Sequence, residues 1–264
     1  MSIDMEVADR LEYLISHPED NPDTPLTADP QSAEVGILLL HGFTGSPYSM
    51  KPLARLLIES GKAVRVPVLP GHGTSWRDLN RYRWNDWLTA AHHALAELTE
   101  KYEHVIVLGL SMGATLTAEL ATSCHGLTGI VCVNPALAWD KPIQYLVPLL
   151  STVLPVGWSI ANDIARPGTQ ECAYTVTPLK ALASLQIAQK RLRHKLWKIS
   201  TPTILCLSST DRVVATTTSE ILRASLLCPL EIRVLRNSRH VATLDYDALK
   251  IYDSVLSLLP RELR

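Results

Sequence analysis

Residue types that together perform nucleophilic catalysis stand in this sequence where buried strands are expected to end. The first is Ser111, the centre of the GxSxG pattern GLSMG, which lies between the apolar run HVIVLGL and the helix-period run MGATLTAELA. This context indicates a nucleophile elbow, a strained turn that presents a serine hydroxyl above the edge of a sheet. A serine that only caps a helix in a glycine-rich turn is the alternative, and the flanking strand and helix disfavour it.

A serine hydroxyl is a weak nucleophile, so a base must take its proton and an acid must orient that base. His240 lies in SRHVATLDYD after the apolar run LEIRVL, and Asp211 lies in TILCLSSTDRVV after the run TILCL. Catalytic groups in open α/β sheets gather at the carboxyl ends of strands, where both residues are expected. The order Ser111, Asp211, His240 is also the chain order of one serine-hydrolase architecture. The sequence therefore predicts a Ser-His-Asp triad.

Other residues compete for the roles of acid and base. Asp245 and Asp247 are close to His240 in sequence, but they stand at the start of the last expected helix and suit capping. His41 and His72 also lie in loops after strands. We expect a structural or binding role for His41, because it adjoins the loop that would hold the oxyanion.

Two backbone N–H groups are expected to stabilise the oxyanion that forms during acyl transfer. One belongs to Met112, the residue after the nucleophile, and the other to Phe43 in the loop HGFTG after an early strand. Phe43 is also the single phenylalanine of the chain, and we expect its ring to pack over the alcohol or acyl side of the pocket.

These residues need a parallel sheet to position them, and the apolar pattern predicts one. Continuous apolar runs suit strands buried on both faces, and helix-period segments separate them. Such alternation predicts an α/β fold with a mostly parallel, doubly wound sheet. The expected strands are 35–40, 63–69, 104–110, 129–134, 203–207 and 230–235, and the expected helices are 47–60, 84–102, 112–124, 216–227 and 245–259.

Residues 139–198 break the alternation with helical patterns and no convincing core strand. We interpret them as a small helical cap, inserted after the strand that follows the nucleophile helix, and residues 1–138 and 199–264 as the core. The apolar stripe of the cap either packs on the sheet or lines an acyl-chain pocket. The candidate pocket residues, besides Phe43, are Ile143, Leu146, Leu150 and Leu154.

Composition excludes several function classes. The chain has 264 residues, a formal net charge of −1, 47% hydrophobic and 19% charged residues, which argues against disorder and against nucleic acid as a main partner. No P-loop, GxGxxG or metal-ligand spacing is visible, so we expect neither a cofactor nor a metal. The acidic N-terminus and five scattered cysteines favour a cytoplasmic protein.

The sequence gives little indication of contact with a membrane. Pro148, Pro155 and Gly157 interrupt the most apolar stretch, 143–160, so stable membrane insertion is not expected. The basic run 189–195 suits a solvated helix face, with peripheral contact to an anionic surface as the alternative.

Several stretches of this sequence resemble the α/β-hydrolase superfamily, and more narrowly its bacterial carboxylesterase and monoacylglycerol lipase group. They are LLLHGFTGSPYSMKPLARLL, LPGHGTS, GLSMGA, NDIARPG with PLKAL, TPTILCLSSTDRVV and RHVATLDYD, from about residue 35 to the C-terminus. Ala114 departs from the pattern, because many relatives carry a second glycine there. The resemblance implies Ser111 as nucleophile, Asp211 as acid, His240 as base, and Phe43 and Met112 as oxyanion donors.

The resemblance implies a serine esterase acting on short-to-medium acyl esters, including monoacylglycerols, through an acyl-enzyme intermediate. The expected partner is therefore a small ester or lipid; the sequence does not indicate an oligomeric state. A thioesterase or a carbon–carbon bond hydrolase uses the same triad and stays open as an alternative. A hydrolase-like binding protein with little turnover is a third possibility, which the intact triad disfavours.

Overall fold

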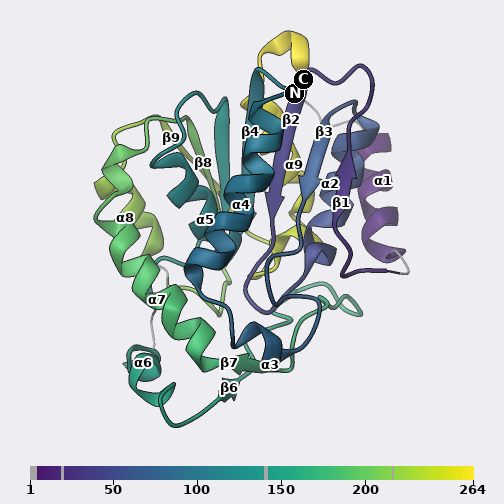
Figure 1. Ribbon diagram of the computed structural model, residues 1–264. Helices are drawn as coiled ribbons and strands as arrows, with labels where there is room; N and C mark the ends of the chain where they lie inside the picture. Colours follow the sequence, from purple (N-terminus) through teal and green to yellow (C-terminus); the bar gives the residue numbers. More distant parts are fainter. Residues whose placement is uncertain (1–4, 19–20, 140–141, 216) are drawn as a thin grey trace.

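A mostly parallel sheet of seven strands forms the centre of the molecule. The computed structural model describes residues 5–18, 21–139, 142–215 and 217–264, and its strand order is β1-β3-β2-β4-β5-β8-β9 (Figure 1). All neighbouring strands pair in parallel except β1, which pairs with β3 in antiparallel register. The strands are β1 Leu26–Ala28, β2 Val35–Leu40, β3 Ala63–Val66, β4 His104–Leu110, β5 Gly129–Val133, β8 Thr203–Ser208 and β9 Leu230–Leu235. The predicted fold class is confirmed.

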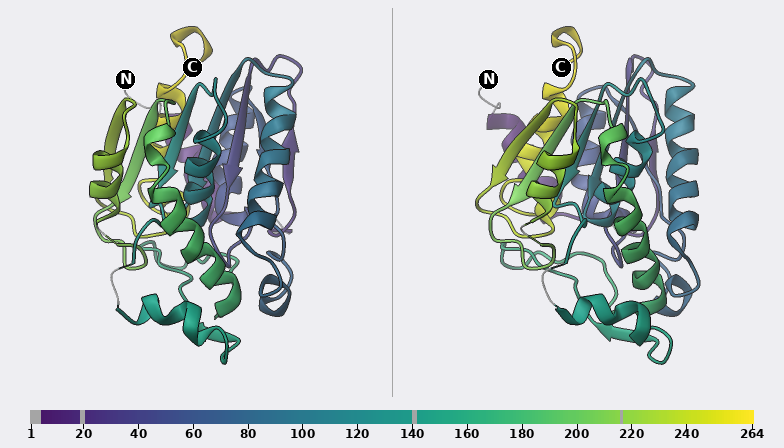
Figure 2. Two further views of the ribbon diagram at one scale, coloured as in Figure 1. Left: turned by 60° about the vertical axis from the view of Figure 1, so that its left-hand side comes forward. Right: turned by 90° about the vertical axis from the view of Figure 1, so that its left-hand side faces the viewer.

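The inner strands are buried because helices cover both faces of the sheet. Along β2, Leu38 and Leu40 face one hydrophobic cluster, whereas Ile37 and Leu39 face the other, as the two-residue period of a strand requires. The first cluster is covered by α4 Trp84–Thr99, α5 Met112–Ala121, α7 Leu179–Arg193 and α8 Thr218–Ser225. The second is covered by α1 Met5–Ser16, α2 Lys51–Glu59 and α9 Ala248–Ser257 (Figure 2).

The expected helices are present with shorter ends. The segment predicted as one helix over 47–60 divides into a 3₁₀ turn, Pro47–Met50, and α2, and Ser46 accepts the N–H of Tyr48 as the cap of that turn. The last helix begins at Ala248, because residues 242–244 form a separate 3₁₀ turn after the predicted base. The sequence did not predict β1, because its three residues lie in a stretch rich in proline and polar residues.

The segment between β5 and β8 lies below the carboxyl ends of the strands in Figure 1. It contains η2 Pro142–Leu146, α6 Val147–Leu150, β6 Val156–Trp158, β7 Val176–Pro178, α7 and η3 Leu196–Lys198. The sequence predicted only helices here, but β6 and β7 form a separate antiparallel pair, too short to show an apolar period. α7 packs against α4 and α5, and the short helix α3 Trp76–Leu79 lies against β7. None of the described helices is long and apolar enough to cross a membrane.

Candidate active site

Ser111 occupies a strained turn between β4 and α5. Its φ of 57° and ψ of −114° lie outside the regions that non-glycine residues ordinarily adopt, which is the conformation expected of a nucleophile elbow. Two glycines allow this turn. A Cβ at Gly109 would lie 2.2 Å from the carbonyl oxygen of Gly113, and a Cβ at Gly113 would lie 2.0 Å from that of Leu40. The glycines of GLSMG are therefore required by close backbone packing.

The structure brings Ser111, His240 and Asp211 together. His240 Nε2 lies 2.8 Å from Ser111 Oγ, and His240 Nδ1 lies 2.7 Å from Asp211 Oδ2. A carboxylate can only accept here, so Nδ1 carries the proton and Nε2 is free to accept the serine proton. The second oxygen of Asp211 accepts the N–H groups of Val213 and Val214 at 2.7 and 3.0 Å, which fixes the carboxylate.

Burial and charge act in opposite directions on the acid and the base. Burial by itself lowers the pKa of His240, but the charge and hydrogen bond of Asp211 outweigh it, and the pKa rises above the ordinary value of 6.5. Burial likewise favours the neutral form of Asp211, but His240 and the two backbone N–H groups bring its pKa below the ordinary value. Asp211 therefore stays ionised while His240 can accept a proton.

The predicted oxyanion donors adjoin the serine. Met112 is the first residue of α5, directly after Ser111, and a Cβ at neighbouring Gly42 would contact Ser111 Cβ at 3.5 Å. Among the described residues, the N–H groups of Phe43 and Met112 donate no hydrogen bond, which leaves both available to a ligand. The loop is held from the other side, because the carbonyl oxygen of Thr44 accepts the N–H of Tyr174 at 3.1 Å.

The ring of Phe43 does not take the place that the sequence interpretation gives it. It is only 8% exposed and contacts the rings of Trp87 and His72 edge-on, with centroid distances of 5.8 and 6.2 Å. The ring packs in the core beneath the loop, because burial among aromatic neighbours removes more apolar surface from water than an open pocket does.

The rival histidines are buried under the same loop. His41 donates from Nδ1 to the carbonyl oxygen of Gly42 at 2.9 Å and accepts the N–H of Leu69 at Nε2, so both nitrogens are used within the protein. Burial lowers its pKa to about 4, and burial also lowers the pKa of His72. Neutral His41 supports the loop after β2, while His240 is the histidine in contact with Ser111.

The rival aspartates support the loop of the base. Asp245 is fully buried and accepts four backbone N–H groups, from Ala165, Arg166, Arg239 and Tyr246. Asp247 accepts the N–H of Asn237 and the hydroxyl of Ser238. Neither contacts the His240 ring in the described structure; both fix the segment that carries it.

Sequence reasoning missed two residues that hold the backbone of His240. Asn134, at the end of β5 with a φ of 44°, donates from Nδ2 to the carbonyl oxygen of His240 at 2.8 Å and accepts the N–H of Ser208. Asp163 accepts the N–H groups of His240 and Arg212 on one carboxylate oxygen, at 3.3 and 3.1 Å. The peptide of His240 is thus held at both ends, and Asp163 connects the loops of the acid and the base.

A third missed residue is Glu171, between the cap and the oxyanion loop. Its Oε1 accepts the N–H of Asn162 at 2.8 Å. Its Oε2 lies close to Gly45 of the oxyanion loop, at 3.4 Å from the place that a Cβ atom on that glycine would take. Burial raises the pKa of Glu171, and its charge contributes to the raised pKa of His240. A signal in the sequence exists only in the neighbouring motif NDIARPG, which indicates a turn but not the partner of Glu171.

An apolar cavity of about 600 Å³ lies within the cap. Two of the candidate pocket residues, Leu150 and Leu154, line it, together with Trp139, Val147, Val156, Trp158, Ile160, Leu179 and Leu182 among others. Leu146 is 48% exposed and does not line it; the side chain of Ile143 is outside the described residues. Ser111 and His240 do not line the cavity themselves. Trp139 of the cavity wall follows three residues after Ala136, whose N–H donates to the carbonyl oxygen of Ser111.

Within the described ranges, no group of three or more His, Cys, Asp or Glu side chains is arranged to hold a metal ion. The contacts of Ser111, His240 and Asp211 offer the attack of Ser111 Oγ on an acyl carbon, assisted by His240 and by two backbone N–H groups.

Known proteins resemble this chain over most of its length. Residues 37–250 match the sequence family described as the Alpha/beta hydrolase family. The chain is 35% identical over 245 residues to the thermostable monoacylglycerol lipase of Bacillus sp. (strain H-257), covering 89% of this chain and 95% of that protein. It is 24% identical to the carboxylesterase of Bacillus subtilis (strain 168), covering 90% and 97%. A solved structure from work on two metagenome-derived lipolytic enzymes, LipS and LipT, has a TM-score of 0.85 and 30% identity, covering 91% and 98%.

Proposed function

The chain belongs to the alpha/beta hydrolase family, and from this premise we propose that it is a serine hydrolase of carboxylic esters. The observation that carries the proposal is the unbroken chain of contacts from Asp211 through His240 to Ser111, at 2.7 and 2.8 Å, in the turn between β4 and α5. The similarity to a monoacylglycerol lipase and a carboxylesterase supports the same class of reaction.

Acylation begins when His240 takes the proton of Ser111 and the serine oxygen attacks the ester carbonyl. The negative charge that develops on the carbonyl oxygen is stabilised by the N–H groups of Phe43 and Met112, neither of which has an acceptor in the described residues. His240 then gives its proton to the leaving alcohol, and Asp211 stabilises the imidazolium in the meantime.

Deacylation repeats these steps with water as the nucleophile. His240 takes a proton from water, the hydroxide attacks the acyl-enzyme, and the same two N–H groups hold the second oxyanion. Ser111 leaves with the proton returned by His240, and the carboxylic acid is released.

We propose short-to-medium acyl esters, including monoacylglycerols, as substrates. The support is the cavity of about 600 Å³ lined by Leu150, Leu154 and other apolar side chains, which suits an acyl chain. Each methylene buried there contributes about 0.8 kcal/mol, so the rate should rise with chain length until the cavity is full. A cytoplasmic location completes the proposal, because the five cysteines are all free.

Labelling with a fluorophosphonate tests the nucleophile. We expect stoichiometric modification at Ser111 and loss of ester hydrolysis, because the reagent needs a serine activated by a base. Ser111→Ala should lower kcat by about 10⁴- to 10⁶-fold with folding intact. Ser209→Ala is the matched control, since Ser209 is exposed at the end of β8 and should leave both readouts unchanged. Ester hydrolysis near the normal rate in Ser111→Ala contradicts the assignment.

A panel of esters and thioesters of increasing acyl length, including monoacylglycerols, tests the substrate class. We expect the highest kcat/KM for medium-chain oxygen esters. A strict preference for acetyl esters would refute the role of the cavity, and a preference for thioesters throughout the panel would favour a thioesterase with the same triad.

A further inference from the structure

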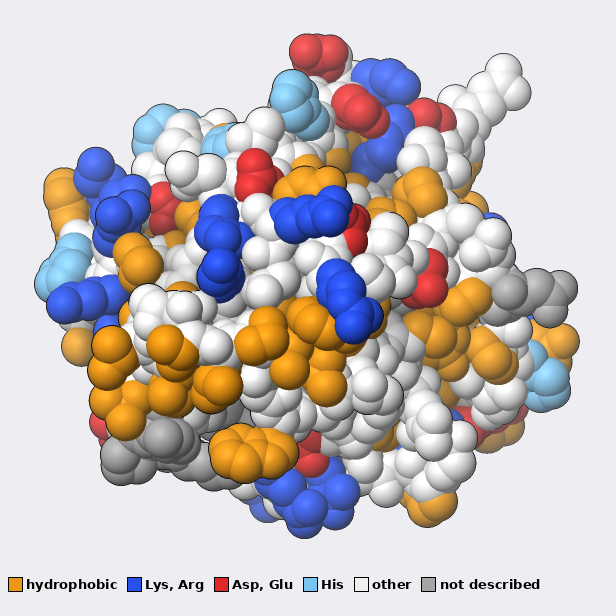
Figure 3. All heavy atoms as spheres, turned by 60° about the horizontal axis from the view of Figure 1, so that its bottom comes forward, with side chains coloured by type: hydrophobic (Ala, Val, Ile, Leu, Met, Phe, Trp, Pro, Cys, Tyr) orange, Lys and Arg blue, Asp and Glu red, His pale blue; other side chains and the backbone are white. Residues whose placement is uncertain are grey.

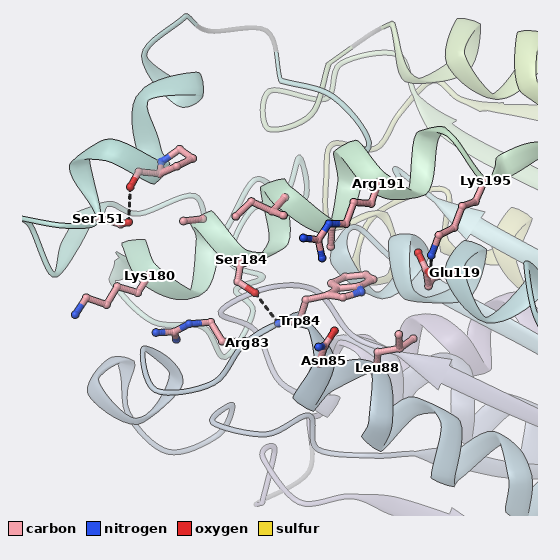
Figure 4. A pocket seen from close by; sticks show the side chains of 14 residues that line it. Arg83, Trp84, Asn85, Leu88, Glu119, Ser151, Lys180, Ser184, Arg191 and Lys195 are labelled. Atoms are coloured by element: carbon pink, nitrogen blue, oxygen red, sulfur yellow. Dashed lines mark hydrogen bonds and ion pairs between the residues drawn. The ribbon is translucent and has the colours of Figure 1, made fainter.

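A second hollow lies between the cap and the core, separate from the apolar cavity. It is a groove of about 580 Å³ between α4, α6 and α7 (Figure 4). Helix α7 is the wall between the two spaces, since Leu179 and Leu182 line the cavity while Ser184 and Arg191 line the groove. The proposed reaction uses none of the polar residues of this groove.

The groove is basic. Arg83, Lys180, Arg191 and Lys195 line it, together with a single carboxylate, Glu119, which is paired with Lys195 at 2.9 Å. Arg83 donates to the carbonyl oxygens of two neighbouring residues, which are neutral. Lys180 and Arg191 have no acidic partner among the described residues. The groove therefore holds a surplus of positive charge that lacks a counterion within the protein.

This surplus is local. Residues 172–210 contain six Lys and Arg residues and no Asp or Glu, although the whole chain has a formal net charge of −1. Three of these six cations, Lys180, Arg191 and Lys195, line the groove, and such a concentration of charge attracts an anionic partner.

An exposed apolar segment borders the groove. Residues 142–162 carry no charged side chain, and Leu149, Val153 and Trp158 are 69%, 76% and 89% exposed. Pro148 and Ser151 of the same segment line the groove, so the apolar surface and the basic surface are continuous. Figure 3 shows hydrophobic side chains gathered beside Lys and Arg on this end of the molecule. Large contiguous apolar surfaces of this kind mark contact sites.

We propose that this face is a docking surface for an anionic lipid membrane, with lipid phosphate groups in the groove and segment 145–158 at the boundary of the acyl chains. The pairing of exposed Trp and Leu side chains with cationic ones is the pattern that binds in the plane of a membrane surface. The charge favours a membrane over an apolar protein partner, because an apolar protein surface would leave Lys180 and Arg191 unpaired.

The proposed function gives this docking a consequence. Leu154 and Trp158 line the apolar cavity and are also exposed, so the cavity reaches the surface on the docking face. A lipid ester would then pass from the membrane into the cavity without crossing water. This last step rests on the proposed ester hydrolysis, whereas the docking itself does not.

Sedimentation with lipid vesicles tests the docking. The full chain is mixed with vesicles of phosphatidylcholine, or of phosphatidylcholine with phosphatidylglycerol, at low and high salt. We expect binding to the anionic vesicles alone, weakened by salt because screening shortens the reach of the charges. The double variant Lys180→Glu, Arg191→Glu should weaken this binding about tenfold or more, and Leu149→Asp with Val153→Asp should weaken it to a similar extent.

Matched controls lie at the opposite end of the sheet. Arg261→Glu changes an arginine in the C-terminal turn, away from the cap (Figure 1). Leu227→Asp changes a leucine that is 81% exposed and lies before the amino end of β9. Both should bind vesicles as the unaltered chain does. Circular dichroism and the thermal midpoint of unfolding should be unchanged in all four variants, which shows that they fold without relying on the proposed function. Hydrolysis of a water-soluble short ester, measured separately, should also be unchanged.

Several results would overturn the docking surface. They are equal binding to neutral and anionic vesicles, normal binding by the charge-reversed variant, or loss of binding in the control variants to the same degree. Normal binding by the Leu149, Val153 variant would also overturn it, because the basic groove would then act as a simple anion site. Vesicle binding by a protein that hydrolyses no ester would leave the docking intact and refute the hydrolase proposal.

Discussion

Two parts of the chain between β5 and β8 contact the rest of the molecule in different ways. Residues 162–174 are bonded to the loops of the proposed triad: Asp163 holds the His240 and Arg212 backbones, and Tyr174 donates its N–H to Thr44 in the oxyanion loop. Residues 144–158 expose six large apolar side chains and contain helices and strands of five residues or fewer.

The difference separates two tasks within one insertion. The part with buried polar contacts fixes the geometry of the base, because breaking any of these bonds leaves a buried donor or acceptor without a partner. The exposed part contributes apolar surface with few polar constraints, which suits contact with an acyl chain or a membrane. We therefore expect substitutions in the first part to change kcat and substitutions in the second to change selectivity.

The strongest test acts inside the polar network. Asp211→Asn should lower kcat by about 10⁴-fold, because an amide cannot hold His240 in the tautomer that leaves Nε2 free to accept. Steady-state kinetics on a soluble ester measures the loss. Asp253→Asn, which changes a surface partner of Arg233, should be without effect. A loss below tenfold in Asp211→Asn would show that another residue serves as the acid.

A smaller effect is expected where the polar network acts through the backbone. Asn134→Ala and Asp163→Ala should each lower kcat by about 10- to 100-fold, because a displaced His240 misplaces the proton acceptor. Asp163→Asn keeps an acceptor oxygen and should retain most of the activity. KM should stay near its normal value, since neither side chain lines the cavity. Equal losses in kcat from Asp163→Asn and Asp163→Ala would argue against positioning by hydrogen bonds.

The exposed part of the insertion offers a matched pair of neighbouring leucines. Leu150 lines the cavity, whereas Leu149 is 69% exposed on the same short helix and does not line it. Leu150→Ala should lower kcat/KM for medium-chain esters about 3- to 10-fold relative to acetyl esters, through lost apolar contact. Leu149→Ala should leave the ratio unchanged. The same change in both variants would show that the cavity does not hold the acyl chain.

The sequence predicted the parts of the site that depend on local patterns. Ser111 stands in a motif whose glycines are required by backbone contacts within five residues or with the adjoining strand, and the apolar runs indicate strands from their own composition. Such signals are contained in short windows, so β2, β3, β4, β5, β8 and β9 were predicted together with the fold class, although β3 ends at Val66 and not at Leu69.

The residues that sequence reasoning missed act over long separations. Asn134 meets His240 across 106 positions, and Asp163 meets it across 77. No local pattern relates such partners, because each looks like an ordinary polar residue in a turn. The position of the Phe43 ring depends on distant residues in the same way. An apolar side chain in a loop can pack inward or outward, and this ring packs inward because Trp87 and His72 lie beside it in the fold.

The smallest expected effect concerns Glu171, which lies in the polar part of the insertion and acts on the base through its charge. His240 must be neutral to accept the serine proton, so kcat/KM should fall at acid pH with a midpoint above 6.5, the ordinary value, because Asp211 raises its pKa. Glu171→Gln removes a negative charge that also favours the imidazolium, so the pKa of His240 falls and the midpoint moves to lower pH. Glu231→Gln, on the exposed side of β9, should not move it. An unchanged midpoint in Glu171→Gln would mean that Glu171 is protonated in the working enzyme and carries no charge that acts on His240.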